Sequence, residues 1–177
     1  LQAQTAGDAG GHLQIAVHRV QAIAAVHEVL AQEGYRLVNV LEVAERIVRA
    51  RGQHLTQPGL AVHLSVDGDA VLLPSKAATS MALVINELLE NAIEHAFVGR
   101  SEGQVRIHCA QVGSDYRVDV SDDGIGMPEK PGDSLGLEIV NALVRDDLHG
   151  TLAFTGRTGG GTHASVQIPR PPQAEMD

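Results

Sequence analysis

The chain has 177 residues and a formal net charge of −9, from 13 basic and 22 acidic side chains. This balance, with the basic residues scattered along the chain, excludes a protein that binds nucleic acid through a basic surface stripe. Hydrophobic residues make up 44% of the chain and aromatic residues 2%, which predicts one aliphatic core of ordinary size. No apolar run reaches the length of about 20 residues that spans a bilayer, and no signal peptide is visible. We therefore expect a cytoplasmic chain without membrane contact.

The first predicted element is a helix over about residues 12–32, between a Gly-rich break at 7–11 and Gly34. Its apolar residues recur with helical period and form a broad stripe: Leu13, Ala16, Val17, Val20, Ile23, Ala24, Val26 and Leu30. A stripe of this width predicts packing against a partner helix, as in a dimer.

The remaining elements predict a mixed α/β domain. A second helix begins after Asn39, a favourable N-cap residue, and ends near Gly52. The elements that follow are a strand at 60–66, the longest helix from Pro74-Ser75 to about Phe97, strands at 104–112 and 116–121, a helix at 134–148, and strands at 151–155 and 162–168. This order predicts an α+β fold, a two-layer sandwich with helices on one face of a mixed sheet.

The longest helix carries the first of three segments with polar residues. Glu87, Asn91 and His95 are spaced i, i+4, i+8 and share one helix face. A carboxylate, an amide oxygen and an imidazole in one row suit a hydrated Mg²⁺ and the phosphates that it carries, because Mg²⁺ prefers hard oxygen ligands. An ordinary solvated helix face produces the same pattern.

The second and third segments are rich in glycine. Asp122-x-Gly124-x-Gly126 follows a strand directly, so the backbone can approach a flat ligand while the carboxylate accepts a hydrogen bond from an exocyclic amine. A tight surface turn is the alternative. Residues 134–140 form a Gly-containing entry into a helix, whose backbone N–H groups can bind phosphate. The glycine spacings of Walker and Rossmann motifs are absent, which argues against those nucleotide folds.

Together these segments resemble the conserved boxes of the histidine kinase, gyrase, heat-shock protein and mismatch-repair ATPase superfamily. Asn91 within Asn-Glu-Leu-Leu-Glu-Asn-Ala resembles the N box, Asp122-x-Gly124-x-Gly126 the first glycine box, residues 134–140 the second, and Gly161-Thr162 the closing Gly-Thr pair. The likeness implies a Bergerat-type ATP-binding fold with ATP and Mg²⁺ as cofactors. Residues 19–28 and 91–97 look like those of soluble actinobacterial sensor histidine kinases that phosphorylate RNA-binding antitermination regulators.

The resemblance assigns roles to single residues. Asn91 would ligate Mg²⁺, Glu87 and His95 would serve catalysis, and Asp122 would bind the adenine amine. The other ligand-binding positions that it implies are Gly124 and Gly126 beside the base, Gly136 and Leu137 facing the phosphates, Lys130 in the lid, and Thr162 completing the adenine site through water. Many members have a basic residue where this chain has Glu94, so Mg²⁺, His95 or Lys130 would have to neutralise the phosphates.

The resemblance also implies three parts: residues 1–34 as the second helix of a dimerisation and phosphotransfer hairpin, 35–170 as the ATP-binding catalytic domain, and 171–177 as a flexible tail. The phosphate-accepting histidine would lie upstream of Leu1, so this chain is expected not to phosphorylate itself. The full-length protein would be a homodimer that passes its phosphate to a response regulator, for which the resemblance suggests an RNA-binding antiterminator. His18 is rejected as the acceptor because Gln21-Ala22 replaces the expected Lys-Asn, and His27 is interpreted as a packing or interface residue.

Three alternatives stay open. An anti-sigma-factor serine kinase shares the ATP-binding fold, but the leading helix with its apolar stripe disfavours it. A nucleotide-binding interaction module without phosphotransfer agrees with Glu94 and with the missing acceptor. A structural domain without a ligand would need all three segments to be coincidences.

Overall fold

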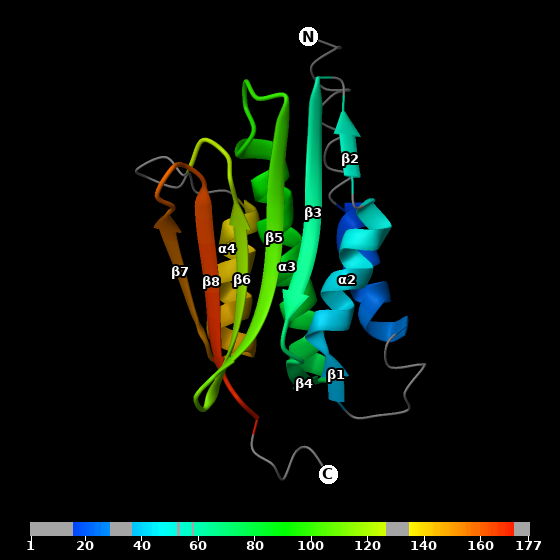
Figure 1. The fold of residues 1–177 in the computed structure, drawn as a ribbon. Coiled ribbons are helices and arrows are strands. Elements are labelled where there is room, and N and C mark those ends of the chain that lie inside the picture. Colours follow the sequence, from blue (N-terminus) through cyan, green and yellow to red (C-terminus); the bar gives the residue numbers. More distant parts are fainter. Residues whose placement is uncertain (1–15, 29–36, 53, 58, 127–134, 172–177) are drawn as a thin grey trace.

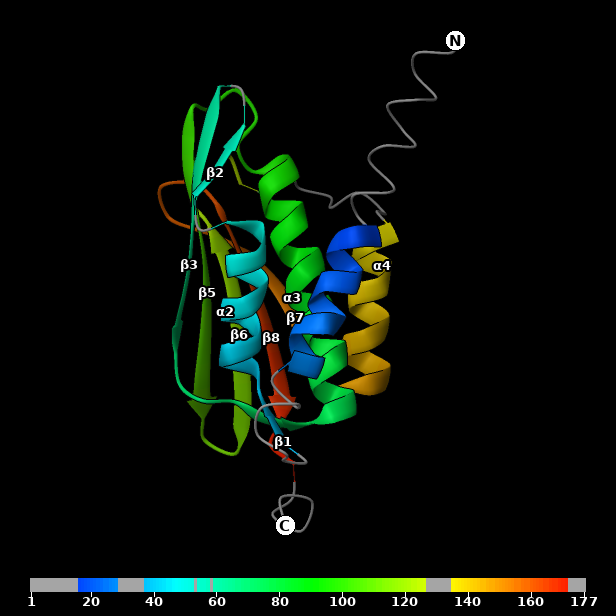
Figure 2. The same cartoon turned by 90° about the vertical axis from the view of Figure 1, so that its right-hand side faces the viewer.

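A computed structural model describes residues 16–28, 37–52, 54–57, 59–126 and 135–171. Helices cover one face of a six-stranded sheet (Figures 1 and 2), so the predicted two-layer α/β sandwich is confirmed. In spatial order the strands are β2 (His54–Gln57), β3 (Leu60–Gly68), β5 (Glu102–Val112), β6 (Asp115–Asp122), β8 (Thr162–Pro169) and β7 (Thr151–Gly156). β3 and β5 run parallel and the other neighbours antiparallel, which makes the sheet mixed.

Three short strands are absent from the sequence-based prediction: β1 (Leu37–Asn39), β4 (Leu72–Pro74) and β2. β1 and β4 pair antiparallel as a separate two-stranded sheet, whereas β2 extends the main sheet at its β3 edge. Strands of three or four residues contain too few alternating positions for a period of two to be recognised.

The predicted second helix is α2 (Val40–Arg51). The side-chain oxygen of Asn39 accepts a hydrogen bond from the Leu41 N–H (3.2 Å), which confirms Asn39 as the N-cap. Gly52 follows the helix with φ +85°, a conformation that glycine adopts without strain. The face of α2 that carries Ala44, Ile47 and Val48 is buried in the core.

The predicted long helix is α3 (Ser75–His95), which begins directly after Pro74. It packs on the sheet beside α2 (Figure 2), and it is buried on most of its surface. Its fully buried apolar side chains include Met81, Val84, Ile85 and Leu89. Three polar residues of the same helix, Ser80, Asn86 and Glu87, are buried as well. Each of them therefore needs a polar partner inside the protein.

The helix predicted over residues 134–148 is observed in two parts. An α-helical part, α4 (Leu135–Ala142), continues into a π-helical turn at Leu143–Asp147. The Ser80 hydroxyl donates a hydrogen bond to the Asp147 carboxylate (2.7 Å), and Lys76 lies 3.6 Å from the same carboxylate. The hydrogen bond from Ser80, followed by the charge of Lys76, lowers the pKa of Asp147. This contact holds the end of the π-helical turn against α3.

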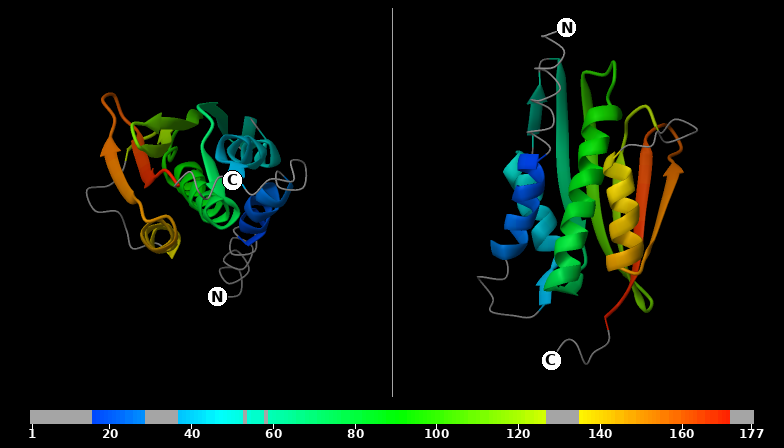
Figure 3. Two further views of the ribbon diagram at one scale, coloured as in Figure 1. Left: turned by 90° about the horizontal axis from the view of Figure 1, so that it is seen from below. Right: turned by 180° about the vertical axis from the view of Figure 1, so that it is seen from behind.

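Residues 16–28 form a helix that Figure 3 shows on the side of α2 and α3 that faces away from the sheet. Ala22, Ala25 and Val26 of this N-terminal helix belong to the same buried core as α2 and α3, while Val17 and Val20 are exposed. Among the described residues, no helix combines the length and the hydrophobicity that crossing a membrane requires.

The connection between β7 and β8 contains three glycines with positive φ, of which Gly159 and Gly161 have similar values of +95° and +93°. A Cβ atom at Gly161 would lie 2.1 Å from the backbone oxygen of Asp122, whereas at Gly159 no atom of the described residues lies within 4 Å. The two positions thus share the backbone strain of a substitution but not the steric clash.

We expect Gly159→Ala to lower the free energy of unfolding by about 1 kcal/mol, because alanine is strained at this φ. Gly161→Ala should lower it by about 1–3 kcal/mol more, because the added methyl group must displace the strand that carries Asp122. Urea unfolding of both variants measures the difference. Equal losses would show that the close approach of the two segments does not constrain the turn.

Candidate functional site

The Asp122 carboxylate is held by two backbone donors from segments far apart in the sequence. It stands at the end of β6 and is 4% exposed. Its Oδ1 atom accepts hydrogen bonds from the Gly124 N–H (2.9 Å) and from the Thr162 N–H (3.2 Å). Because these bonds go to one oxygen, the carboxylate is fixed while Oδ2 can accept a hydrogen bond from a ligand. The structure thus brings together three predicted site residues: Asp122, Gly124 and Thr162.

Glycine allows the backbone segments around Asp122 to approach one another closely. A Cβ atom at Gly124 would lie 2.1 Å from the backbone oxygen of Ala96, which follows α3. The Ile125 N–H donates to that oxygen (2.8 Å). Gly126 has φ +86°, and a Cβ atom there would lie 3.6 Å from the Gly161 oxygen. The two glycine segments and the end of α3 therefore approach one another through backbone atoms, an arrangement that suits a flat ligand.

Glu87 and Asn91 lie beneath the first turn of α4. A Cβ atom at Gly136 would lie 3.0 Å from Glu87 Oε2 and 3.9 Å from Asn91 Oδ1. Among the described residues, Asn91 Nδ2 is the one buried side-chain nitrogen or oxygen without a hydrogen-bond partner. Leaving such a group unpaired costs about 1–3 kcal/mol, and unpaired buried groups mark places where a ligand or ion belongs.

Oxygen ligands for a cation are available at this corner, which we call the α3–α4 corner and define by Glu87, Asn91 and Gly136. Within the described parts of the chain, no group of three His, Cys, Asp or Glu residues is arranged to hold a metal. Mg²⁺ commonly takes only one or two protein oxygens and completes its shell with water and substrate phosphates. The Asn91 amide beside the Glu87 carboxylate fits this mode of binding, and the α4 N-terminus adds backbone N–H groups suited to phosphate.

The buried Glu87 carboxylate is paired with an arginine of the N-terminal helix, a contact that is absent from the sequence-based prediction. Arg19 donates from Nε to Oε1 (2.7 Å) and from Nη2 to Oε2 (2.8 Å). The hydrogen bond to Glu87 raises the pKa of Arg19, and the charge of Glu87 adds to this effect. The partners are 68 positions apart, so no local pattern could have revealed them.

A second arginine, Arg51 of α2, is also missing from the predicted site. Its guanidinium contacts Glu90 Oε2 (2.6 Å) and Asn86 Oδ1 (2.7 Å). His18 Nδ1 lies 3.1 Å from the same Glu90 oxygen. The polar face of α3 is therefore tied to α2 and to the N-terminal helix by charged groups.

The other predicted site residues are placed differently. The His95 side chain is 71% exposed and its nearest described acidic partner is Glu94, at 3.8 Å, so the structure does not bring it to the α3–α4 corner. Leu137 is half-buried in the first turn of α4. Lys130 lies outside the described residues. His27 lines an apolar hollow on the N-terminal helix together with Val20 and Ile23.

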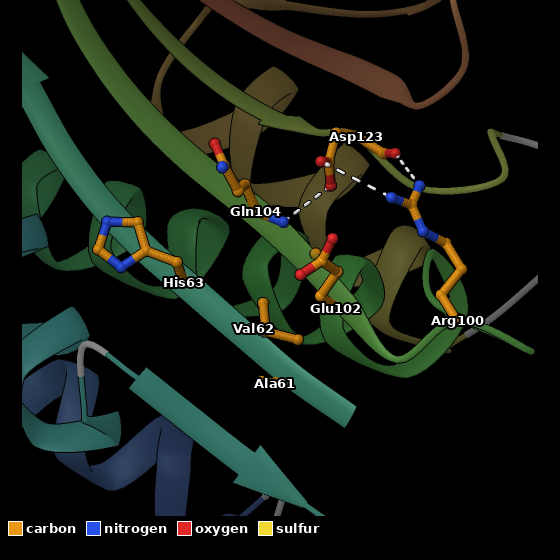
Figure 4. A pocket seen from close by; sticks show the side chains of 8 residues that line it. Ala61, Val62, His63, Arg100, Glu102, Gln104 and Asp123 are labelled. Carbon is orange, nitrogen blue, oxygen red and sulfur yellow. Dashed lines mark hydrogen bonds and ion pairs between the residues drawn. The ribbon is translucent and has the colours of Figure 1, made fainter. Parts of the chain in front are cut away.

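A separate hollow of about 300 Å³ lies beside β3 and β5 (Figure 4), and its lining does not include Glu87, Asn91 or Asp122. Its exposed side chains Ala61, His63 and Gln104 alternate with buried ones, which places it on the sheet face away from the helices. Arg100 donates to the Asp123 backbone oxygen, and Asp123 Oδ1 accepts from the Gln104 N–H (2.7 Å). These bonds support, from the far side, the loop that begins at Asp122.

Comparison with known proteins agrees with this geometry. Residues 77–172 match the family model described as histidine kinase-, DNA gyrase B-, and HSP90-like ATPase. The histidine kinase domain of the Erythrobacter litoralis EL346 blue-light activated histidine kinase has the same fold, with a TM-score of 0.77 and 28% identity over 99% of this chain and 84% of that chain. The catalytic domain of the histidine kinase ThkA, at 20% identity and a TM-score of 0.57, covers 78% of this chain and 98% of that chain and shows the fold alone.

Two curated relatives extend the likeness over nearly the whole chain. The sensor histidine kinase PdtaS of Mycobacterium tuberculosis is 35% identical over 96% of this chain and 35% of its own length. Blue-light-activated histidine kinase 2 of Erythrobacter litoralis is 31% identical over 96% of this chain and 51% of its own length. The chain thus spans between about a third and a half of these relatives. It belongs to the histidine kinase-, DNA gyrase B-, and HSP90-like ATPase family, and carries a catalytic ATPase domain of the histidine kinase type.

Proposed function

We propose that this chain binds ATP with Mg²⁺ and transfers the γ-phosphoryl group to a histidine on a segment outside the chain, for relay to a response regulator. The observation that carries the proposal is the buried Asn91 amide nitrogen, which has no partner among the described residues and lies beside Glu87 at the start of α4. A site built this way has unmet capacity for a polar ligand where family members hold the metal and phosphates.

The adenine would lie between the two glycine segments. Asp122 Oδ1 is already used by two backbone N–H groups, so Oδ2 accepts a hydrogen bond from the exocyclic amine. Gly124 and Gly126 line the flat face of the base, and Thr162 contacts it through water. The burial of Asp122 makes the hydrogen bond stronger than it would be in water.

The phosphates would lie at the α3–α4 corner. The Asn91 side-chain oxygen ligates Mg²⁺, which neutralises charge on the transferring group when bound. Backbone N–H groups of Gly136 and Leu137 face the phosphates. Glu87 accepts the proton that the acceptor imidazole loses as its nitrogen bonds to the γ-phosphorus, while the bond from that phosphorus to the bridging oxygen breaks and ADP leaves. Roles for His95 in catalysis and Lys130 in phosphate neutralisation stay predictions.

The proposal extends to the rest of the protein. Residues 1–34 are one arm of a helical hairpin, residues 35–170 the catalytic domain, and 171–177 a tail. The exposed Val17 and Val20 support pairing of this arm with another helix in a cytoplasmic homodimer. The regulator that receives the phosphate would be of the RNA-binding antiterminator kind, as the resemblance of residues 19–28 implies.

One alternative has a specific observation in its favour. Both oxygens of Glu87 are occupied by Arg19, and Glu94 replaces a basic residue. A module that binds nucleotide without transferring phosphate would tolerate both features. Phosphotransfer to a separate acceptor distinguishes the two functions.

Asp122→Asn should weaken ATP binding about tenfold or more, because a hydrogen bond to a charged group contributes about 1.5–3 kcal/mol. Calorimetric titration with ATP and Mg²⁺ measures the loss. Asp123→Asn is the matched control, since this neighbouring carboxylate contacts the Gln104 N–H on the other side of the loop. Equal affinities of wild type and Asp122→Asn would remove Asp122 from the adenine site.

Asn91→Ala should abolish Mg²⁺-dependent phosphotransfer and change the free energy of unfolding by less than about 1 kcal/mol, because the amide nitrogen lost has no partner. Asn86→Ala provides the contrast: it removes the acceptor of an Arg51 hydrogen bond and should cost about 1–3 kcal/mol of stability. Urea unfolding and transfer to an added acceptor hairpin are the two measurements. Full transfer activity in Asn91→Ala would refute the metal assignment.

The chain itself should not become labelled by γ-phosphate-labelled ATP, yet it should label an added acceptor hairpin from a full-length relative. The reason is that the proposed acceptor histidine lies on a segment outside this chain. Of the histidines in the N-terminal helix, neither His18, which contacts Glu90, nor His27 is proposed as an acceptor. Labelling followed by acid treatment, which hydrolyses phosphohistidine, gives the answer. Strong labelling of this chain alone would mean that one of these two histidines accepts phosphate.

A further inference from the structure

An arginine from outside the family-matched segment reaches the proposed phosphate end of the site. Arg19 belongs to the N-terminal helix, whereas the family model matches residues 77–172. Its guanidinium forms two parallel hydrogen bonds with Glu87, which is 5% exposed, while the Arg19 side chain remains 30% exposed. The Arg19 guanidinium therefore reaches the buried Glu87 carboxylate while its side chain stays partly accessible to solvent.

The position of Arg19 relative to α4 follows from the oxygen that it binds. Nη2 of Arg19 donates to Glu87 Oε2, and this oxygen is the atom that a Cβ at Gly136 would approach to 3.0 Å. Glu87 Oε2 therefore lies between the Arg19 guanidinium and the first turn of α4. Phosphate oxygens bound at this turn would lie beside Arg19.

Charge balance also favours Arg19 over the other described cations on this face of α3. ATP carries several negative charges, and α3 has Glu94 at a position where many relatives have a basic residue. Arg51 is 5% exposed and already holds Glu90 and Asn86. His18 contacts Glu90, one helical turn from Glu87. Arg19 combines a permanent charge with an accessible side chain.

We propose that Arg19 is a γ-phosphate-binding residue that Glu87 holds in place until nucleotide arrives. On binding of ATP with Mg²⁺, the guanidinium exchanges the carboxylate for γ-phosphate oxygens, which suit its two-pronged geometry equally well. The exchange leaves a Glu87 oxygen free to take the proton of the acceptor histidine. This inference rests on the proposed function and adds the residue that recognises the terminal phosphate.

The ratio of ATP affinity to ADP affinity, both measured by calorimetry with Mg²⁺, tests the exchange. This ratio cancels effects that the two nucleotides share, such as altered packing. Arg19→Gln should lower the ratio about tenfold, because only ATP carries the γ-phosphate. Arg46→Gln is the matched control, since Arg46 of α2 binds Glu28 of the same N-terminal helix (2.9 Å) away from the site. Its ratio should equal that of wild type.

A second pair of variants keeps the test valid if Arg19→Gln does not fold with Glu87 left unpaired. Glu87→Gln removes the competing carboxylate charge and should raise the ratio above that of wild type. Adding Arg19→Gln to it removes both charges, so that no buried charge is left unpaired, and should lower the ratio again. For these variants only the ATP and ADP affinities are measured, because Glu87 is part of the proposed catalytic machinery.

Three results would overturn the inference. The ratio could be unchanged by loss of Arg19 in both backgrounds, which would limit Arg19 to a structural ion pair. Arg46→Gln could lower the ratio as much as Arg19→Gln, which would assign the effect to docking of the helix. Wild type could bind neither nucleotide, and this result alone would also refute the proposed function.

Discussion

The arrangement of the helices depends on the need to pair the buried charges of α3. This helix places aliphatic side chains against the sheet, yet its opposite face carries Asn86, Glu87 and Glu90, of which the first two are buried. A buried carboxylate without a partner is strongly destabilising. Arg51 from α2 and Arg19 from the N-terminal helix supply the partners. The same ion pairs therefore orient two helices and position the face of α3 that we propose to be catalytic, so that stability and the proposed function share their residues.

The opposite end of the site depends on close backbone packing. Asp122 is fixed by N–H groups from Gly124 and Thr162, and these segments can meet only because Gly124 and Gly161 lack a side chain. In consequence the carboxylate is oriented before any ligand binds. Such preorganisation lowers the cost of binding, since no group has to be ordered at that moment. The proposed adenine end is thus held in place by backbone donors, whereas the proposed phosphate end contains the Asn91 amide nitrogen, without a partner among the described residues, and the Arg19–Glu87 ion pair.

The sequence predicted those features that depend on neighbouring residues. Asn39 capped its helix as expected, α3 began after Pro74, and the spacing of Glu87 and Asn91 brought both to the start of α4. The same spacing failed to bring His95 to them, because α3 ends at this residue and its side chain faces solvent. The roles of Arg19 and Arg51 could not be predicted, since an arginine gives no sign of which distant carboxylate it pairs with. The short strands β1, β2 and β4 had too few residues for a pattern.

Glu87 connects the N-terminal helix to the proposed nucleotide site in energetic terms. Its carboxylate binds Arg19 on one side and lies against Gly136 on the other. If a bound nucleotide changes the strength of the Arg19 contact, then the docking of the helix must change nucleotide affinity by the same free energy, because coupling between two binding equilibria is reciprocal. A movement of the helix, whatever its origin, would in this way be transmitted to the phosphates without a change in the sheet. The ion pair is short and direct, so this coupling passes through a single contact between the helix and Glu87.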